Sequence, residues 1–152
     1  MRKFVLFIAA LWLLNACGLN ATDPDADVKE QACKFAEAYF NYDFVKARRF
    51  VTPESEKWLR FAASIVTQED VDLINATSET VSVSVTDCYH QNDSTARVTM
   101  TVYNAVVKDS LERPARMASE TEVALMLVRR GDEYRVKMWS YARYKSACTQ
   151  DL

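Results

Sequence analysis

Hydrophobic residues recur at helical spacing in the first half of the chain and at every second position in much of the second half. A first helix is predicted to begin at Asp27, because Asp27 and Glu30 match the pattern of an N-terminal helix cap. Residues 41–43 predict its end, and Asp43 is expected to cap a short second helix. The apolar face of the first helix is formed by Val28, Ala32, Phe35, Ala36 and Tyr39.

Two more helical segments are predicted before residue 78. Thr52 and Pro53 mark the start of one, since Thr caps helices well and Pro is accepted at the first helical position. Thr67 and Asp70 predict one more short turn through residue 74. The first of these segments is amphipathic through Trp58, Leu59, Ala62, Ile65 and Val66.

After Ser78 the hydrophobic period falls to two, which predicts strands. Residues 90–94 and 130–132 have turn composition, and residues 108–117 predict a charged loop. The third strand is apolar on both faces, which favours a central place in the sheet. The four expected strands cover residues 81–86, 96–102, 123–128 and 134–139.

Helices followed by four strands predict an α+β fold, with N-terminal helices packed on a twisted antiparallel sheet of about four strands. The alternation along each strand indicates which side chains face the helices. We expect Val83, Val98, Leu125 and Val136 to be buried against Phe35 and Tyr39.

The N-terminal residues have the pattern of a targeting signal. Arg2 and Lys3 precede an apolar run over residues 4–14, which is shorter than the ~20 residues of a membrane span but suits a secretory signal. Residues 14–17, Leu-Asn-Ala-Cys, resemble the lipobox of bacterial lipoproteins. The resemblance implies that residues 1–16 are a signal peptide and that Cys17 is lipidated. A plain signal peptide with an accidental cysteine, or a short membrane anchor, is the alternative.

The lipobox also implies a location. Lipid on Cys17 would anchor the protein to a membrane of the cell envelope, and Gly18, by resemblance to many Gram-negative lipoproteins, favours the outer membrane. Residues 17–26 are small and polar after the cysteine and are expected to form a tether. Residues 27–152 are then a single domain.

Four segments of this domain resemble small NTF2-like, cystatin-fold lipoproteins. They are residues 35–39 (Phe-x-x-x-Tyr), 43–55 (DFVKARRFVTPES), 94–102 (STARVTMTV) and 123–136 (VALMLVRRGDEYRV). Tyr134 stands where Trp is usual, and Gly131 lies one residue early. The resemblance covers most of residues 28–139 and implies a sheet wrapped around the first helix as a cone.

Composition excludes several kinds of chemistry. The formal net charge of −2 gives no overall attraction to nucleic acid. The chain has one histidine, His90, which is expected in an exposed turn, and two glycines. Cys-x-x-Cys, His-Glu-x-x-His and Gly-x-Ser-x-Gly motifs are absent. We therefore expect no catalytic residue, no metal site and no cofactor.

The interior of the cone is the alternative site. Some families that this chain resembles carry out acid–base chemistry there, and the candidate residues are Tyr39, Asp43 and Glu122. Tyr39 is equally explained as a core residue and Asp43 as a helix cap.

With Cys17 lipidated, three cysteines remain, so at most one internal disulfide can form. If the strand from Val81 is unbroken, Cys88 points away from the helices, whereas Cys148 shares the parity of Val136. This favours a Cys33–Cys148 bond, although a bulge would reverse the argument and three free thiols are the alternative.

A partner surface is expected on the outer face of the sheet. Arg135 and Lys137 alternate with buried positions, and the same parity continues beyond them. Arg and aromatic residues are enriched at protein–protein hot spots, although cross-strand pairs also stabilise a sheet without any partner. The candidate residues are Met126, Val128, Trp139, Tyr141 and Arg143.

Together these patterns predict a membrane-tethered, non-enzymatic binding or accessory module of the cell envelope. Its partner would be another protein or a second copy of the chain, and not nucleic acid. A small-molecule-binding protein or acid/base enzyme that uses the cone interior is the first alternative, and a purely structural envelope protein is the second.

The lipidation site can be tested directly. Wild-type protein should incorporate a labelled fatty acid and partition to membranes, whereas Cys17→Ala should do neither, because the thiol that carries the lipid is gone. Label in Cys17→Ala, or none in the wild type, would refute lipidation at this residue.

Overall fold

A four-stranded antiparallel sheet in the order β1-β2-β3-β4 forms one layer of the protein. The computed structural model describes residues 23–108 and 114–139. The strands are β1 (Ser82–Asn92), β2 (Thr95–Val107), β3 (Arg116–Arg130) and β4 (Glu133–Lys137). The helices are α2 (Ala26–Phe40), α3 (Phe44–Ala47), α4 (Glu56–Ser64) and α5 (Gln68–Ala76), with 3-10 turns at Arg48–Phe50 and Pro53–Ser55. The α+β prediction is confirmed.

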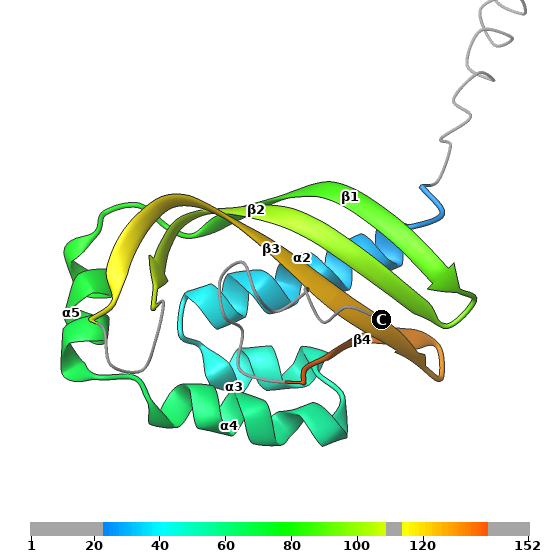
Figure 1. The fold of residues 1–152 in the computed structure, drawn as a ribbon, viewed down its shortest axis with the longest axis horizontal. Coiled ribbons are helices and arrows are strands. Elements are labelled where there is room, and N and C mark those ends of the chain that lie inside the picture. Colours follow the sequence, from blue (N-terminus) through cyan, green and yellow to red (C-terminus); the bar gives the residue numbers. More distant parts are fainter. Residues whose placement is uncertain (1–22, 109–113, 140–152) are drawn as a thin grey trace, which may run out of the picture.

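The sheet arches over α2, and α3 and α4 lie farther from the sheet (Figure 1). Phe35 and Tyr39 of α2 are buried in one core with the inner face of the strands. Val98, Leu125 and Val136 are buried in the same core, as predicted, while Val83 is half-buried at its edge. Alternation along the strands therefore identified the inner face correctly.

A β-bulge changes the faces of β1. The register with β2 shifts between Val85 and Asp87. Val83 and Val85 pack on the core before the shift, and Cys88 packs on it afterwards, opposite the fully buried Val98. The assumption of an unbroken strand was therefore wrong, and Cys88 faces the helices.

The bulge removes the parity argument used for the disulfide. Cys33 and Cys88 are both free thiols. Cys148 lies outside the described residues, so the Cys33–Cys148 bond stays a prediction.

Two boundaries differ from those predicted. Helix α2 begins at Ala26, after Asp25 at the cap position, so Asp27 lies in its first turn rather than capping it. His90 lies in β1, and the hairpin turns at residues 93–94 instead. The Asp23 carboxylate pairs with Lys29 at 2.6 Å, so the end of the predicted tether belongs to the folded domain.

Two predicted helix caps are confirmed. Asp43 accepts a hydrogen bond from the backbone N–H of Lys46 at 2.9 Å and caps α3. Thr67 and Asp70 form a reciprocal capping box at the start of α5. Asp70 is also buried, and it pairs with the ammonium of Lys108 at 3.2 Å. This ion pair fixes α5 against the end of β2.

The free edge of β4 is closed by residues 51–55, which contain the second 3-10 turn and its N-cap Thr52. Val51 forms a parallel bridge with Val136, and the Thr52 N–H donates to the Val136 carbonyl at 2.9 Å. The Ser55 hydroxyl accepts from the Met138 N–H at 2.8 Å and shares a hydrogen bond of 2.7 Å with the Thr52 hydroxyl. Both hydroxyl residues are fully buried. The Thr-Pro-Glu-Ser segment, predicted only as a helix start, thus also holds the edge strand.

Replacing Ser55 by Ala should destabilise the fold by about 1–3 kcal/mol, because the buried Met138 N–H would lose its acceptor and the Thr52 hydroxyl would lose its hydrogen bond to Ser55. Urea denaturation of the full-length protein followed by circular dichroism measures this loss. Ser64→Ala is the matched control, since its exposed hydroxyl donates only to the Phe61 carbonyl. Equal stability of the two variants would contradict the role of Ser55 at the β4 edge.

Candidate functional site

A row of four side chains crosses the outer face of the sheet, one from each strand. Tyr89 lies opposite Arg97, Arg97 opposite Met126, and Met126 opposite Lys137. On β2 and β3, the residues directly before and after Arg97 and Met126 are core residues. Since side chains alternate between the two faces of a strand, the row points away from α2. Tyr89 is 61 % exposed. The row is therefore a continuous outer surface of aromatic, basic and thioether groups.

Trp139 extends this surface beyond β4. Its ring is 51 % exposed, and the Lys137 Nζ lies 5.4 Å from the ring centroid, a cation–π distance. Met126 and Val128 are half-buried beside it on β3. Tyr141 and Arg143, the other predicted members, lie outside the described residues. We call Tyr89, Arg97, Met126, Lys137 and Trp139 the outer row.

Arg135 does not contribute to the outer row in the way its parity predicted. Its guanidinium donates to the Arg49 carbonyl and pairs with Glu133 at 2.6 Å. The side chain is thus held at the β4 edge by the chain's own groups, which reduces its availability for a partner.

The opposite end of the outer face is acidic. Glu122 on β3 lies opposite Thr101 on β2, and Glu120 lies opposite Tyr103. Both glutamates are exposed. The outer face therefore has basic and aromatic groups near β4 and acidic groups toward the other end of the long strands.

The interior site predicted at Tyr39, Asp43 and Glu122 is not assembled. Tyr39 is buried among aromatic rings, with centroids 5.4 Å from Phe35 and 5.6 Å from Phe44. The Asp43 carboxylate caps α3, and Glu122 lies on the outer face because its neighbour Val123 packs in the core. In the described part of the chain, no buried side-chain nitrogen or oxygen lacks a hydrogen-bond partner. The three candidate residues therefore have no common space in which to act on a ligand.

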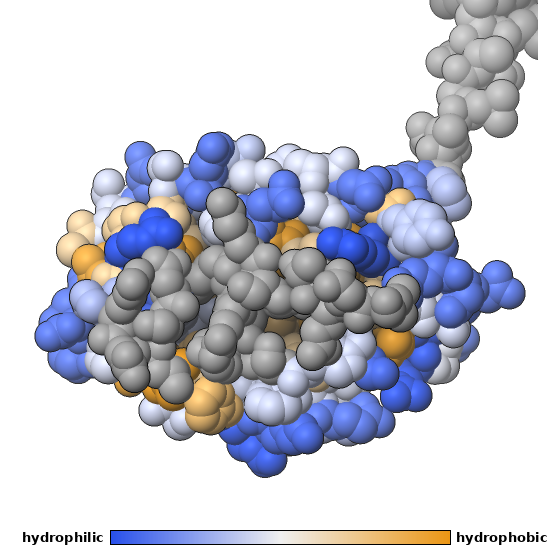
Figure 2. Space-filling model, in the orientation of Figure 1, coloured by the Kyte–Doolittle hydropathy of each residue, from blue (hydrophilic) through white to orange (hydrophobic). Residues whose placement is uncertain are grey.

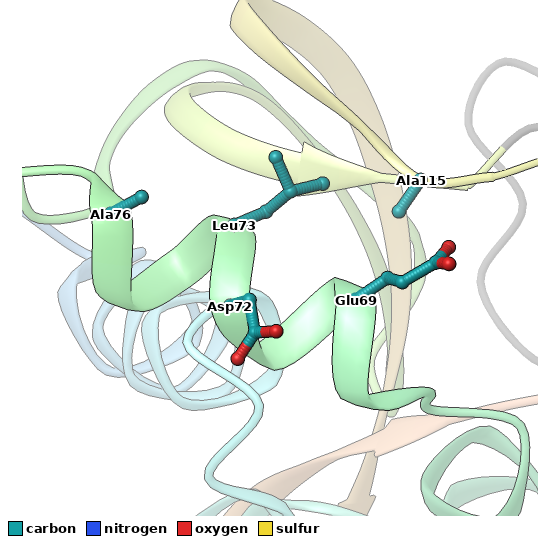
Figure 3. A pocket seen from close by; sticks show the side chains of 5 residues that line it. All are labelled: Glu69, Asp72, Leu73, Ala76 and Ala115. Atoms are coloured by element: carbon teal, nitrogen blue, oxygen red, sulfur yellow. The ribbon is translucent and has the colours of Figure 1, made fainter.

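An open hollow of about 450 Å³ lies between α5 and the segment that leads into β3. Leu73 and Ala115 face it, with Glu69 at its border (Figure 3). The remaining lining residues are Asp72 and Ala76. Its polar groups are the carboxylates of exposed residues, so it offers a small apolar floor without a buried group that would select a ligand.

Surface hydropathy does not reveal a single large apolar patch on the side seen in Figure 2. Outside the part that grey atoms cover, hydrophobic residues form separate small areas among polar ones (Figure 2). Val45 on α3 is the most exposed large apolar residue of the described part of the chain, at 79 %. Such scattered residues are normal at a protein surface.

A cluster that sequence analysis missed lies where α2 begins. Donor atoms of Asp25, Cys88 and His90 all lie within 4.8 Å of one another. The His90 Nε2 hydrogen bonds to Asp25 Oδ1 at 2.9 Å, across 65 residues of sequence. No local motif spacing marks such a set, and the sequence named the bulge in β1 that completes it only as an alternative to an unbroken strand.

Comparison with family models, with curated proteins and with solved structures finds no match for this chain. Within residues 23–108 and 114–139, no helix is long and apolar enough to cross a membrane. The resemblances to lipoproteins and to NTF2-like domains therefore stay predictions.

Proposed function

We propose that the protein is a non-enzymatic binding module, tethered to a membrane of the bacterial cell envelope through lipid on Cys17, and that its outer sheet face contacts another protein. The observation that carries this proposal is the outer row, which presents Tyr89, Arg97, Met126, Lys137 and Trp139 on one rigid surface. Gly18 favours the outer membrane as the site of anchoring.

The composition of the outer row suits protein recognition. Aromatic residues, Arg and Met are enriched at the centres of protein–protein interfaces. Strands hold these side chains at fixed positions, so that little conformational entropy of the backbone is lost on binding. Cross-strand contacts within the row also stabilise the sheet, but this does not require Tyr89 and Trp139 to be more than half exposed.

The charges of this face indicate the chemistry of the partner. Arg97 and Lys137 would attract an acidic group of the partner, and an apolar group next to it would contact Trp139. A second copy of the chain could supply such acidic groups through Glu120 and Glu122, since a two-fold axis can bring opposite ends of one face together. The same glutamates and the net charge of −2 oppose binding of nucleic acid.

The tether restricts where the partner can be. Because Asp23 is bound to the folded domain, only residues 18–22 separate it from Cys17. An extended chain of that length spans about 20 Å. The proposed module would therefore work close to the membrane surface, on partners in or near the same membrane.

The acid/base enzyme and small-molecule carrier receive less support. Both need convergent polar groups in an apolar cavity. Tyr39, Asp43 and Glu122, which would have provided them, are occupied by core packing, by a helix cap and by the outer face respectively.

The test is a double change at the two ends of the outer row, Tyr89→Ala with Trp139→Ala. Detergent-solubilised full-length protein should sediment as a self-associated species or capture a partner by crosslinking in envelope extracts. Hot-spot residues contribute about 2 kcal/mol or more each, so each single change should weaken binding about 30-fold and the double variant should bind several hundred-fold more weakly if the two effects add.

Val45→Ala is the matched control, because Val45 is the most exposed large apolar residue described and lies on α3. It should leave association unchanged, and both variants should melt within a few degrees of the wild type. Unchanged association in the double variant, or its unfolding, would remove the outer row as a dedicated binding surface.

A further inference from the structure

We propose that Asp25, Cys88 and His90 form a binding site for one divalent transition-metal ion, of which Zn²⁺ is the expected occupant. A carboxylate oxygen, a thiol sulfur and an imidazole nitrogen come together here, each within 4.8 Å of the other two. These are the three donor types that bind Zn²⁺ in proteins. The site is separate from the outer row and does not depend on the proposed function.

The fold builds this site from two segments that are distant in sequence. Cys88 and His90 are two residues apart on β1, so they project from the same side of the strand. The bulge between Val85 and Asp87 turns this side inward, toward the N-terminus of α2. Asp25, the cap residue of α2, completes the set.

The Asp25 side chain does not cap the helix that it precedes. An Asp at the N-cap usually accepts a hydrogen bond from the second or third backbone N–H of the helix, which stabilises by about 1 kcal/mol. Asp25 makes no such bond. Its Oδ1 is directed instead to His90, at 2.9 Å. The carboxylate is thus oriented toward the imidazole and the thiol rather than toward its own helix.

The spacing of the donors is compatible with tetrahedral coordination. With metal–ligand bonds of about 2.0–2.3 Å, neighbouring donors in a tetrahedron lie about 3.3–3.7 Å apart. The Asp25–His90 pair is a little closer than this, and the remaining separations are at most 4.8 Å. Side chains of Asp25 and His90 are 25 % and 36 % exposed, so they can rotate slightly and a metal can enter. Water would take the fourth position.

Charge balance also favours a dication. The Cys88 thiolate and the Asp25 carboxylate together neutralise the charge of Zn²⁺. The nearby Lys29 ammonium is paired with Asp23 at 2.6 Å and lies 4.0 Å from Asp25. The Asp23 carboxylate offsets part of the repulsion that the Lys29 ammonium would exert on the bound ion.

The thiol is available for such a bond. Cys88 is not in a disulfide, and the predicted Cys33–Cys148 pairing would leave it free. Metal binding would displace the thiol proton from Sγ to solvent as the metal–sulfur bond forms.

Zinc binding should be measured on the full-length protein in detergent, by competition with a chromogenic chelator. Wild type is expected to bind one Zn²⁺ per chain. Cys88→Ser, His90→Gln and Asp25→Asn should each weaken binding at least ~10-fold, since each removes or weakens a direct ligand. Cys33→Ser is the matched control, a second half-buried free cysteine whose loss should leave binding unchanged.

Co²⁺ supplies a second readout that separates binding from folding. Wild type and Cys33→Ser should show a thiolate-to-cobalt charge-transfer band that Cys88→Ser lacks. Zn²⁺ should also raise the melting temperature of the wild type by several degrees, because it binds only the folded arrangement, and should not raise that of Cys88→Ser.

The proposal is overturned if wild type binds no stoichiometric Zn²⁺, or if Cys88→Ser keeps both the affinity and the cobalt band. In either case the Asp25–His90 contact would be a structural tie between α2 and β1 and nothing more. Thermal melting of each variant without metal identifies any variant that fails to fold. The zinc affinities of the variants that do fold then test the proposal.

Discussion

The closure of the β4 edge is the constraint on which the outer surface depends. A five-residue edge strand holds its place poorly by pairing on one side, because its other row of N–H and C=O groups is unpaired. Here Thr52 and Ser55 satisfy those groups from the other side, with their hydroxyls bonded to each other in a fully buried position. Lys137 and Trp139 are the chain neighbours of Met138, so the hydrogen bond that holds Met138 also fixes their positions in the outer row. A loosened edge would therefore alter the outer row together with the buried Val136 of the core.

The hydrophobic pattern predicted most of the fold because burial has a regular period in each element. The spacing of Phe35 and Tyr39 located the inner face of α2, and the alternation around Val98 and Leu125 located the inner face of the sheet. Asp43 was predicted as a cap because its role depends only on the three residues after it. Local rules are reliable where the determining contacts are local.

The errors arose where a distant contact outweighed a local rule. Asp27 suits a helix cap, but the cap position lies two residues earlier at Asp25, whose side chain is bonded to His90 on β1. The bulge near Val85 leaves no signature in the alternation of Val and Ser, so Cys88 was assigned to the wrong face. The sequence could not show that Thr52 and Ser55 bind β4, because that partner lies some eighty residues away.

Strand geometry links the two proposed sites. Cys88 and His90 point inward from β1, and Tyr89, the residue between them, points outward as the first member of the outer row. An ion held by its two neighbours would fix the backbone on both sides of Tyr89 and lower the entropy that this end of the outer row loses when a partner binds. Thermodynamic linkage makes such an effect reciprocal, so a partner that orders Tyr89 would strengthen metal binding to the same degree. The coupling needs no movement of the core, because Val98 on β2 holds this part of β1 in register from the buried side.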